Sequence, residues 1–108
     1  MENTAMEETE PEAYLMATSA RTLDLLRAIE REMVERLGVG RAEAVARINR
    51  MWCGLDLSGE YDLILHEDEY YWALGIYFGD VPDWSPAADR SGWTPRPAPA
   101  AGSEYWTV

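Results

Sequence analysis

Apolar side chains recur every three or four residues in the first part of the chain, and this spacing predicts an amphipathic helix. The helix is best defined from Thr22 to Leu37, with a looser extension toward Glu10. Gly38 is expected to end it, because glycine readily takes the left-handed conformation that follows a helix C-terminus. The face is formed by Leu15, Ser19, Leu23, Leu26, Ile29 (or Glu30), Met33 and Leu37.

The extension has a start signal of its own. Thr9 and Glu12 are three residues apart, which is the spacing of a capping box. Pro11 occupies a first-turn position, where its missing N–H does no harm. The Thr18–Ser19 pair leaves a second interpretation open, in which the stretch divides into two pieces.

A second helix is predicted from Arg41 to about Cys53, with Gly54 after it as the stop signal. The Val39–Gly40 connector is short, so the two helices are expected to be neighbours. Cys53 is interpreted as a small buried hydrophobic residue at the helix end. The positions expected to face the core are Ala42, Val45, Ala46, Ile48, Asn49 and Trp52.

Residues 55–65 carry mixed signals. The alternation of Tyr61, Leu63 and Leu65 with their neighbours allows a short strand, but no second clear strand exists to pair with it. A helical turn or an extended segment is therefore favoured. A third helix is predicted from about Glu67 to Phe78, since its acidic start suits the positive end of a helix dipole.

Residues 80–108 hold five of the six prolines, so neither a regular helix nor a central strand is expected there. They also contain Trp84, Trp93 and Trp106, which are costly to leave in water. An arm that wraps the chain's own core is the favoured interpretation, while docking on a partner and disorder remain open.

The predicted fold class is all-α or nearly so, with three main helices in a small bundle and the Pro/Trp-rich C-terminal arm packed on it. Residues 1–8 are expected to be an acidic flexible N-terminus, residues 9–79 a helical domain, and residues 80–108 the arm. A chain of 108 residues makes one domain at most, and some domains of this size depend on a partner or a homodimer.

The composition of the chain indicates its cellular location and the kind of genome that encodes it. No apolar run approaches the roughly 20 residues of a membrane span. The N-terminal segment has no apolar core of a secretory signal, and a single cysteine suits a reducing compartment, so a cytoplasmic location is expected. All nine basic residues are arginine and alanine is abundant, which indicates a GC-rich, bacterial genome.

The net charge of −11 is unevenly distributed. Between Met51 and Asp89 there are nine carboxylates and no arginine, whereas residues 21–50 carry seven arginines and five carboxylates. A negative field repels the nucleic-acid backbone and anionic membranes, and it attracts basic proteins. The overall charge therefore argues against nucleic acid and membranes as partners.

The acidic segment is also rich in aromatic side chains. Aromatic anchors rimmed by carboxylates suit a partner rich in arginine or lysine. Together with the lack of a catalytic motif, this predicts a non-enzymatic protein-interaction module without cofactor or metal, such as an inhibitor, an immunity-type protein or an adaptor. The predicted partner-binding residues are Glu67, Asp68, Glu69, Tyr70, Tyr71 and Trp72.

An alternative comes from the part of the chain that is richest in arginine. Residues 32–52 resemble a DNA-binding helix-turn-helix in outline, with a Leu-Gly-Val turn followed by a helix bearing Arg41, Arg47 and Arg50. The resemblance implies a DNA-binding regulator that uses these arginines. The pattern keeps apolar residues at the positions held here by Ala44 and Arg47, and Arg47 departs from it.

A second alternative is a metal-dependent enzyme. His66 and Glu69 are three residues apart and would share a helix face, and histidine with carboxylates can bind zinc, iron or manganese. The paired-histidine motif of zinc peptidases and the Glu-x-x-His order of di-iron bundles are both absent. An acidic helix start with a surface histidine is the simpler interpretation.

Overall fold

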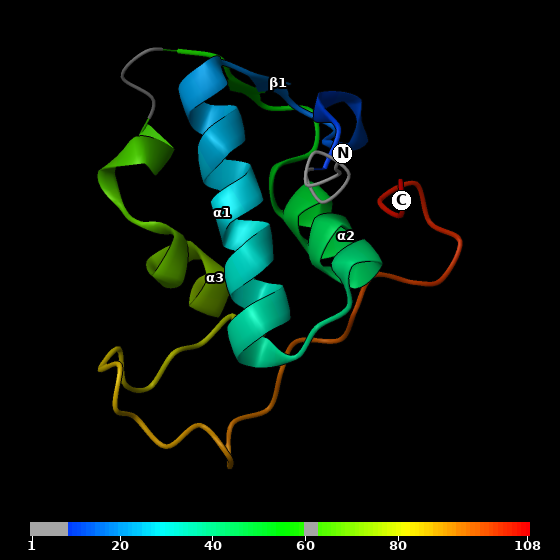
Figure 1. Ribbon diagram of the computed structural model, residues 1–108. Coiled ribbons are helices and arrows are strands. Elements are labelled where there is room, and N and C mark those ends of the chain that lie inside the picture. Colours follow the sequence, from blue (N-terminus) through cyan, green and yellow to red (C-terminus); the bar gives the residue numbers. More distant parts are fainter. Residues whose placement is uncertain (1–8, 60–62) are drawn as a thin grey trace, which may run out of the picture.

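The computed structural model describes residues 9–59 and 63–108 (Figure 1). Over these ranges the chain is mostly helical, with three α-helices and one small two-stranded parallel sheet. The radius of gyration is 13.8 Å, close to the ~13 Å expected of a compact domain of this length. The prediction for residues 1–8 and the part of the strand prediction that rests on Tyr61 lie outside the described residues.

Helix α1 (Ala20–Leu37) begins at a capping box formed by Ser19 and Thr22. The Thr22 amide donates to the Ser19 hydroxyl at 3.1 Å, and the Ser19 amide donates to the Thr22 hydroxyl at 2.8 Å. At the other end Gly38 adopts φ 71°, as predicted from its position. The C-terminal boundary of the predicted helix is therefore confirmed, and its core-facing side includes the fully buried Leu26 and Ile29.

The predicted helical extension toward Glu10 is wrong. Residues Pro11–Ala13 form an isolated 3-10 turn, η2, and the chain is then extended as far as the cap of α1. The Thr9 hydroxyl does not cap η2. It donates instead to the carboxylate of Glu30 in the middle of α1, so a contact distant in sequence replaces the local one.

Glu30 anchors this N-terminal segment from a position that is only 5% exposed. It accepts a hydrogen bond from the Tyr14 hydroxyl at 2.6 Å and pairs with Arg41 at 3.2 Å. Burial raises the pKa of Tyr14 well above its usual range, and the neighbouring carboxylate adds to the effect. A buried charge is tolerated here because three polar groups converge on it.

Helix α2 (Arg41–Trp52) follows after a short connector and packs beside α1 (Figure 1). Residues 44–49 are all buried, so α2 is covered on more than one side. The prediction that Cys53 is buried is wrong: it is exposed. Cys53 lies at the C-cap with φ −50° and ψ 130°, where the backbone leaves the helix and turns its side chain off the packed face.

A two-residue parallel pairing joins β1 (Ala17–Thr18) to β2 (Asp56–Leu57). The expectation that no second strand would pair with residues 55–65 is wrong for Asp56–Leu57. The partner lies directly before α1, and its two residues are too few to produce a recognisable alternation. Leu63–His66 form the 3-10 helix η3, so the favoured helical turn is confirmed there.

Helix α3 (Glu69–Phe78) packs mainly against α1 (Figure 1). It begins two residues later than predicted because Asp68 is its N-cap, accepting the Tyr71 amide at 3.0 Å. Gly79 ends it with φ 79°, and its amide donates to the Gly75 carbonyl at 2.9 Å.

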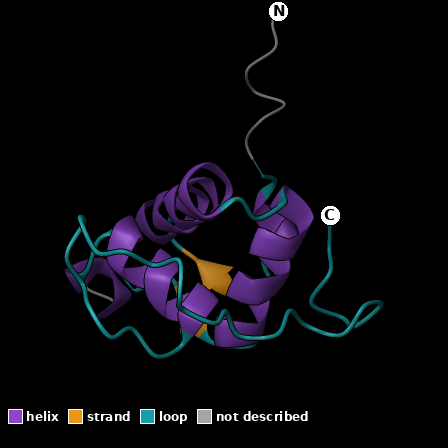
Figure 2. Ribbon diagram, turned by 90° about the horizontal axis from the view of Figure 1, so that it is seen from below, coloured by secondary structure: helices purple, strands orange, loops and turns teal. Residues whose placement is uncertain are grey.

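Residues 80–108, all of them described, form no helix or strand and run around the helices as a long loop (Figure 2). The Arg96 amide donates to the Tyr77 carbonyl at 2.9 Å, and Arg50 donates to the Pro97 carbonyl at the same distance. Near the C-terminus, the fully buried Asn49 of α2 donates to the Tyr105 carbonyl at 3.0 Å. These bonds connect the segment to α2 and α3.

Candidate functional site

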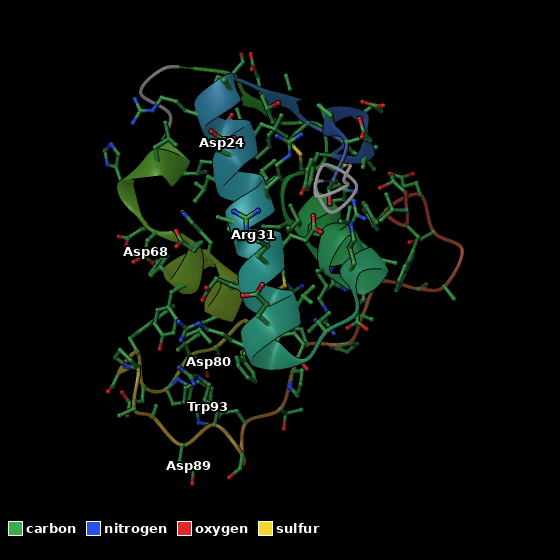
Figure 3. The ribbon with its side chains drawn as sticks, viewed as in Figure 1. Asp24, Arg31, Asp68, Asp80, Asp89 and Trp93 are labelled. Carbon is green, nitrogen blue, oxygen red and sulfur yellow. The ribbon has the colours of Figure 1, made fainter. Side chains whose placement is uncertain are left out.

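The six residues predicted to bind a partner lie at the start of α3 and in the turn before it. Glu67 and Asp68 are exposed, and Glu69 is half-buried. The Asp68 carboxylate is held by the Tyr71 amide, so its position is fixed by the helix cap. Figure 3 shows Asp68 at the outer side of the molecule, pointing away from α1.

The aromatic rings form a ladder that runs from the core to the surface. Buried Trp52 contacts Trp72 edge-to-face at a ring separation of 5.3 Å, and Trp72 contacts Tyr71 in the same way at 5.0 Å. The Trp72 indole donates to the Ile64 carbonyl at 2.8 Å. Trp72 is therefore an internal support rather than an exposed anchor.

At the outer end of the ladder Tyr71 stacks on Trp84, with the ring centres 4.7 Å apart and the planes inclined by 16°. Trp84 is 43% exposed, which makes it one of the few large apolar side chains with a substantial free surface. The sequence analysis did not include Trp84 among the site residues. Its signal was present, since a tryptophan in a proline-rich segment needs a partner, but which ring it would meet could not be derived.

Tyr70 points into the loop that follows α3. Its hydroxyl lies 3.2 Å from the carbonyl oxygens of both Trp84 and Ser85, and it accepts a hydrogen bond from Arg90 at 2.6 Å. Tyr70 thus positions the loop that carries Trp84. Of the three predicted aromatic residues, Tyr71 is the one that shares a ring stack with an exposed side chain.

The carboxylates around this stack have no arginine partner. The described ion pairs join Arg27 to Asp24, Arg36 to Glu32, Arg41 to Glu30 and Arg47 to Glu43, all of them on α1 and α2. None of the described carboxylates between Met51 and Asp89 is in such a pair. The negative charge of this segment is therefore not neutralised within the part of the chain that the structure describes.

Several of these carboxylates are bonded by nearby serines instead. Asp83, beside Trp84, accepts the Ser85 amide at 2.9 Å. Hydrogen bonds from Ser58 lower the pKa of Asp56, and hydrogen bonds from Ser91 lower the pKa of Asp89. Hydrogen bonds of this kind favour the ionised form, so they preserve the negative charge of the surface.

The three arginines of the helix-turn-helix alternative are each engaged within the chain. The Arg47 side chain is 4% exposed, donates to Glu43 at 2.8 Å and lies 4.7 Å from the centre of the Tyr77 ring. Arg41 pairs with buried Glu30, and Arg50 donates to the Pro97 carbonyl. Contact of Arg47 with DNA would require these bonds to break.

His66 is exposed at the end of η3, and Glu69 is half-buried in the first turn of α3. Across residues 9–59 and 63–108, no three histidine, cysteine, aspartate or glutamate side chains come together as a possible metal site. Ser58 donates both its amide and its hydroxyl to the carboxylate of Asp56.

The chain matches no protein-family model, no curated protein and no solved structure. Among the described helices, none combines the length and the hydrophobicity needed to cross a membrane.

Proposed function

We propose that this chain is a non-enzymatic interaction protein that binds a basic partner protein through an acidic aromatic face. The face consists of the Tyr71–Trp84 stack and the carboxylates of Glu67, Asp68 and Asp83. Its role would be that of an inhibitor, an immunity-type protein or an adaptor. The supporting observation is the exposed end of a row of contacting rings, in a segment whose described carboxylates form no ion pair with a described arginine.

The negative charge of the face supports the proposal, because it favours both tight binding and fast association with a basic partner. A patch of unpaired carboxylates raises the local concentration of a cationic surface and speeds its association, an effect that weakens with salt. Part of the positive charge of α1 and α2 is used within the chain, because Arg41 and Arg47 pair with carboxylates and Arg50 donates to a carbonyl.

The ring stack supports the proposal through its rigidity. Tyr71 is backed by Trp72, and the loop carrying Trp84 is held by the Tyr70 hydroxyl. A pre-ordered aromatic anchor loses little conformational entropy on binding, and tryptophan is enriched among the residues that dominate interface energies. An arginine or lysine side chain over the exposed Trp84 face would add a cation–π contact.

The test is affinity capture from a native lysate, first at low and then at moderate salt, with identification of the basic proteins retained. Trp84→Ala is expected to weaken the captured complex by about 30-fold or more, the scale of an interface hot spot. A charge variant combines Glu67→Gln, Asp68→Asn and Asp83→Asn. Asparagine retains the helix cap and the serine bond while removing the charge.

A matched control carries Glu12→Gln, Asp24→Asn and Glu35→Gln, which also removes three exposed carboxylates, all outside the proposed face. The control should bind like the wild type, whereas the charge variant should lose the salt-sensitive part of the affinity. Failure to retain any partner at either salt concentration would count against the proposal. So would a partner that binds the Trp84→Ala and charge variants as tightly as the wild type.

A further inference from the structure

A hollow of about 260 Å³ lies between the C-terminal half of α1 and α3. Leu37, Ala73 and Leu74 form its apolar wall, and Glu32, Arg36, Tyr70 and Arg90 form its polar wall. A second hollow of about 270 Å³ shares Arg36, Leu37 and Arg90 with the first and extends toward Trp93. Arg36 and Arg90 therefore line both hollows.

Arg90 has no carboxylate partner in the described chain, although the protein carries twenty acidic residues. It is half-buried and donates to the Tyr70 hydroxyl at 2.6 Å. Its guanidinium carbon lies 5.6 Å from the Tyr70 ring centre and 5.8 Å from that of Trp93. A partly desolvated cation without a counter-ion is unfavourable, so the site favours the entry of an anionic group.

The geometry also limits the charge and the size of that group. Arg36 pairs with Glu32 at 3.1 Å and its side chain is 67% exposed, so it is free to reorient toward a second acceptor. Two arginines and one glutamate leave a surplus of one positive charge, which matches a monoanion. The volume is near the lower end of the roughly 300–1,000 Å³ of small-molecule sites, which indicates a small ligand.

From these observations we infer that the hollow is a binding site for a small monocarboxylate with an apolar body, about the size of benzoate. The carboxylate lies between Arg36 and Arg90, and the apolar body packs on Leu37, Ala73 and Leu74. Arginine suits this task because its planar fork matches the two oxygens of a carboxylate. The site requires no protein partner, although Tyr70 lines it and also holds the loop that carries Trp84.

The test is a titration of the ¹⁵N-labelled full chain with four probes, followed by NMR. Benzoate has both a negative charge and an apolar body. Benzamide has the apolar body without the charge, whereas acetate and inorganic phosphate have the charge without the apolar body. Benzoate should shift the amide signals of Ala73 and Leu74 and the indole signal of Trp93 saturably. Its Kd should be at least 10-fold lower than that of each other probe.

Variants assign the effect to the two arginines. Arg90→Gln should weaken benzoate binding at least 10-fold, and Arg36→Gln should weaken it several-fold. The second variant alters an exposed side chain, so it remains informative if Arg90→Gln disturbs the loop. Arg21→Gln, an exposed arginine in the first turn of α1, should change nothing.

Four results would overturn the inference. They are the absence of saturable shifts with benzoate, equal binding of benzamide, phosphate binding as tight as that of benzoate, and an equal loss of affinity in Arg21→Gln.

Discussion

Asn49 is fully buried in α2, and its side-chain amide joins three separate parts of the chain. Its oxygen accepts the Leu15 amide at 2.8 Å, and its nitrogen donates to the carbonyls of Ala13 at 3.1 Å and Tyr105 at 3.0 Å. The helical spacing predicted that this position faces the core. The bonds explain why a polar side chain is tolerated there, because each of its polar atoms has a partner.

Asn49→Ala should destabilise the protein by about 3 kcal/mol. The Leu15 amide loses its acceptor in a buried setting, which costs about 1–3 kcal/mol. The small cavity and the freed Tyr105 carbonyl add roughly 1 kcal/mol, while the Ala13 carbonyl retains its bond from the Thr107 hydroxyl at 2.6 Å. Against a total stability of about 5–15 kcal/mol, the loss is large.

Urea unfolding followed by tryptophan fluorescence measures the effect. With a slope of about 1.5 kcal/mol per molar urea, the midpoint should fall by roughly 2 M. A fall equivalent to less than about 1 kcal/mol would refute the assignment of Asn49 as a structural node, because surface substitutions alone cause changes of about 0.5 kcal/mol.

Asn49→Asp is the matched control, since it has the same shape. Its carboxylate still accepts the Leu15 amide, but while ionised it cannot donate to the two carbonyls and repels them. Protonation restores one donor, so the stability difference from the wild type should shrink as the pH falls. A difference that stays constant from neutral to acidic pH would show that the donated bonds contribute nothing.

Four further substitutions test the backbone conformation of two glycines, the cap of α1 and the ionisation of Tyr14. Gly79→Ala should cost about 1–2 kcal/mol in urea unfolding, because φ is 79° and the added Cβ would lie 2.8 Å from the Arg96 Cδ. Gly75→Ala, inside α3 with open space at its Cβ, should stabilise by about 0.5–1 kcal/mol; equal effects of the two would contradict this account. Ser19→Ala removes the cap of α1 and should cost about 1 kcal/mol by the same assay. The pKa of Tyr14 is raised in the folded state, so the neutral phenol stabilises the fold. This contribution to the free energy of unfolding is complete below the ordinary pKa of tyrosine and is lost as the pH rises above that value. Tyr14→Phe should therefore be less sensitive to alkaline unfolding than the wild type, and an unchanged pH profile would exclude Tyr14 as the cause.

The helix ends that are marked by nearby residues in the sequence could be predicted. The periodic apolar face and Gly38 fixed the end of α1, and the Gly79 stop fixed that of α3. The start of α1 was not predictable in this way. Thr9 and Glu12 have the spacing of a capping box, but the Thr9 hydroxyl bonds to Glu30, 21 residues away, and a contact so distant in sequence produces no periodic pattern.

The candidate site was predictable only in part. The acidic and aromatic composition located the start of α3. Which ring is an inner support and which reaches the surface depends on the return of the loop carrying Trp84, and the proline-rich sequence does not specify that path. The burial of Arg47 also required the structure, because its ring contact with Tyr77 crosses between two helices.

The bonds around Asn49 span long stretches of chain, and this has a kinetic consequence. The Thr107 hydroxyl and the Ala13 carbonyl are separated by 94 positions, so their meeting requires closure of almost the whole chain. Helices form far faster than such closures, which places this junction among the last events of folding. By the same reasoning, the two ends should detach together first under mild stress, which amide hydrogen exchange would register as early loss of protection at Leu15.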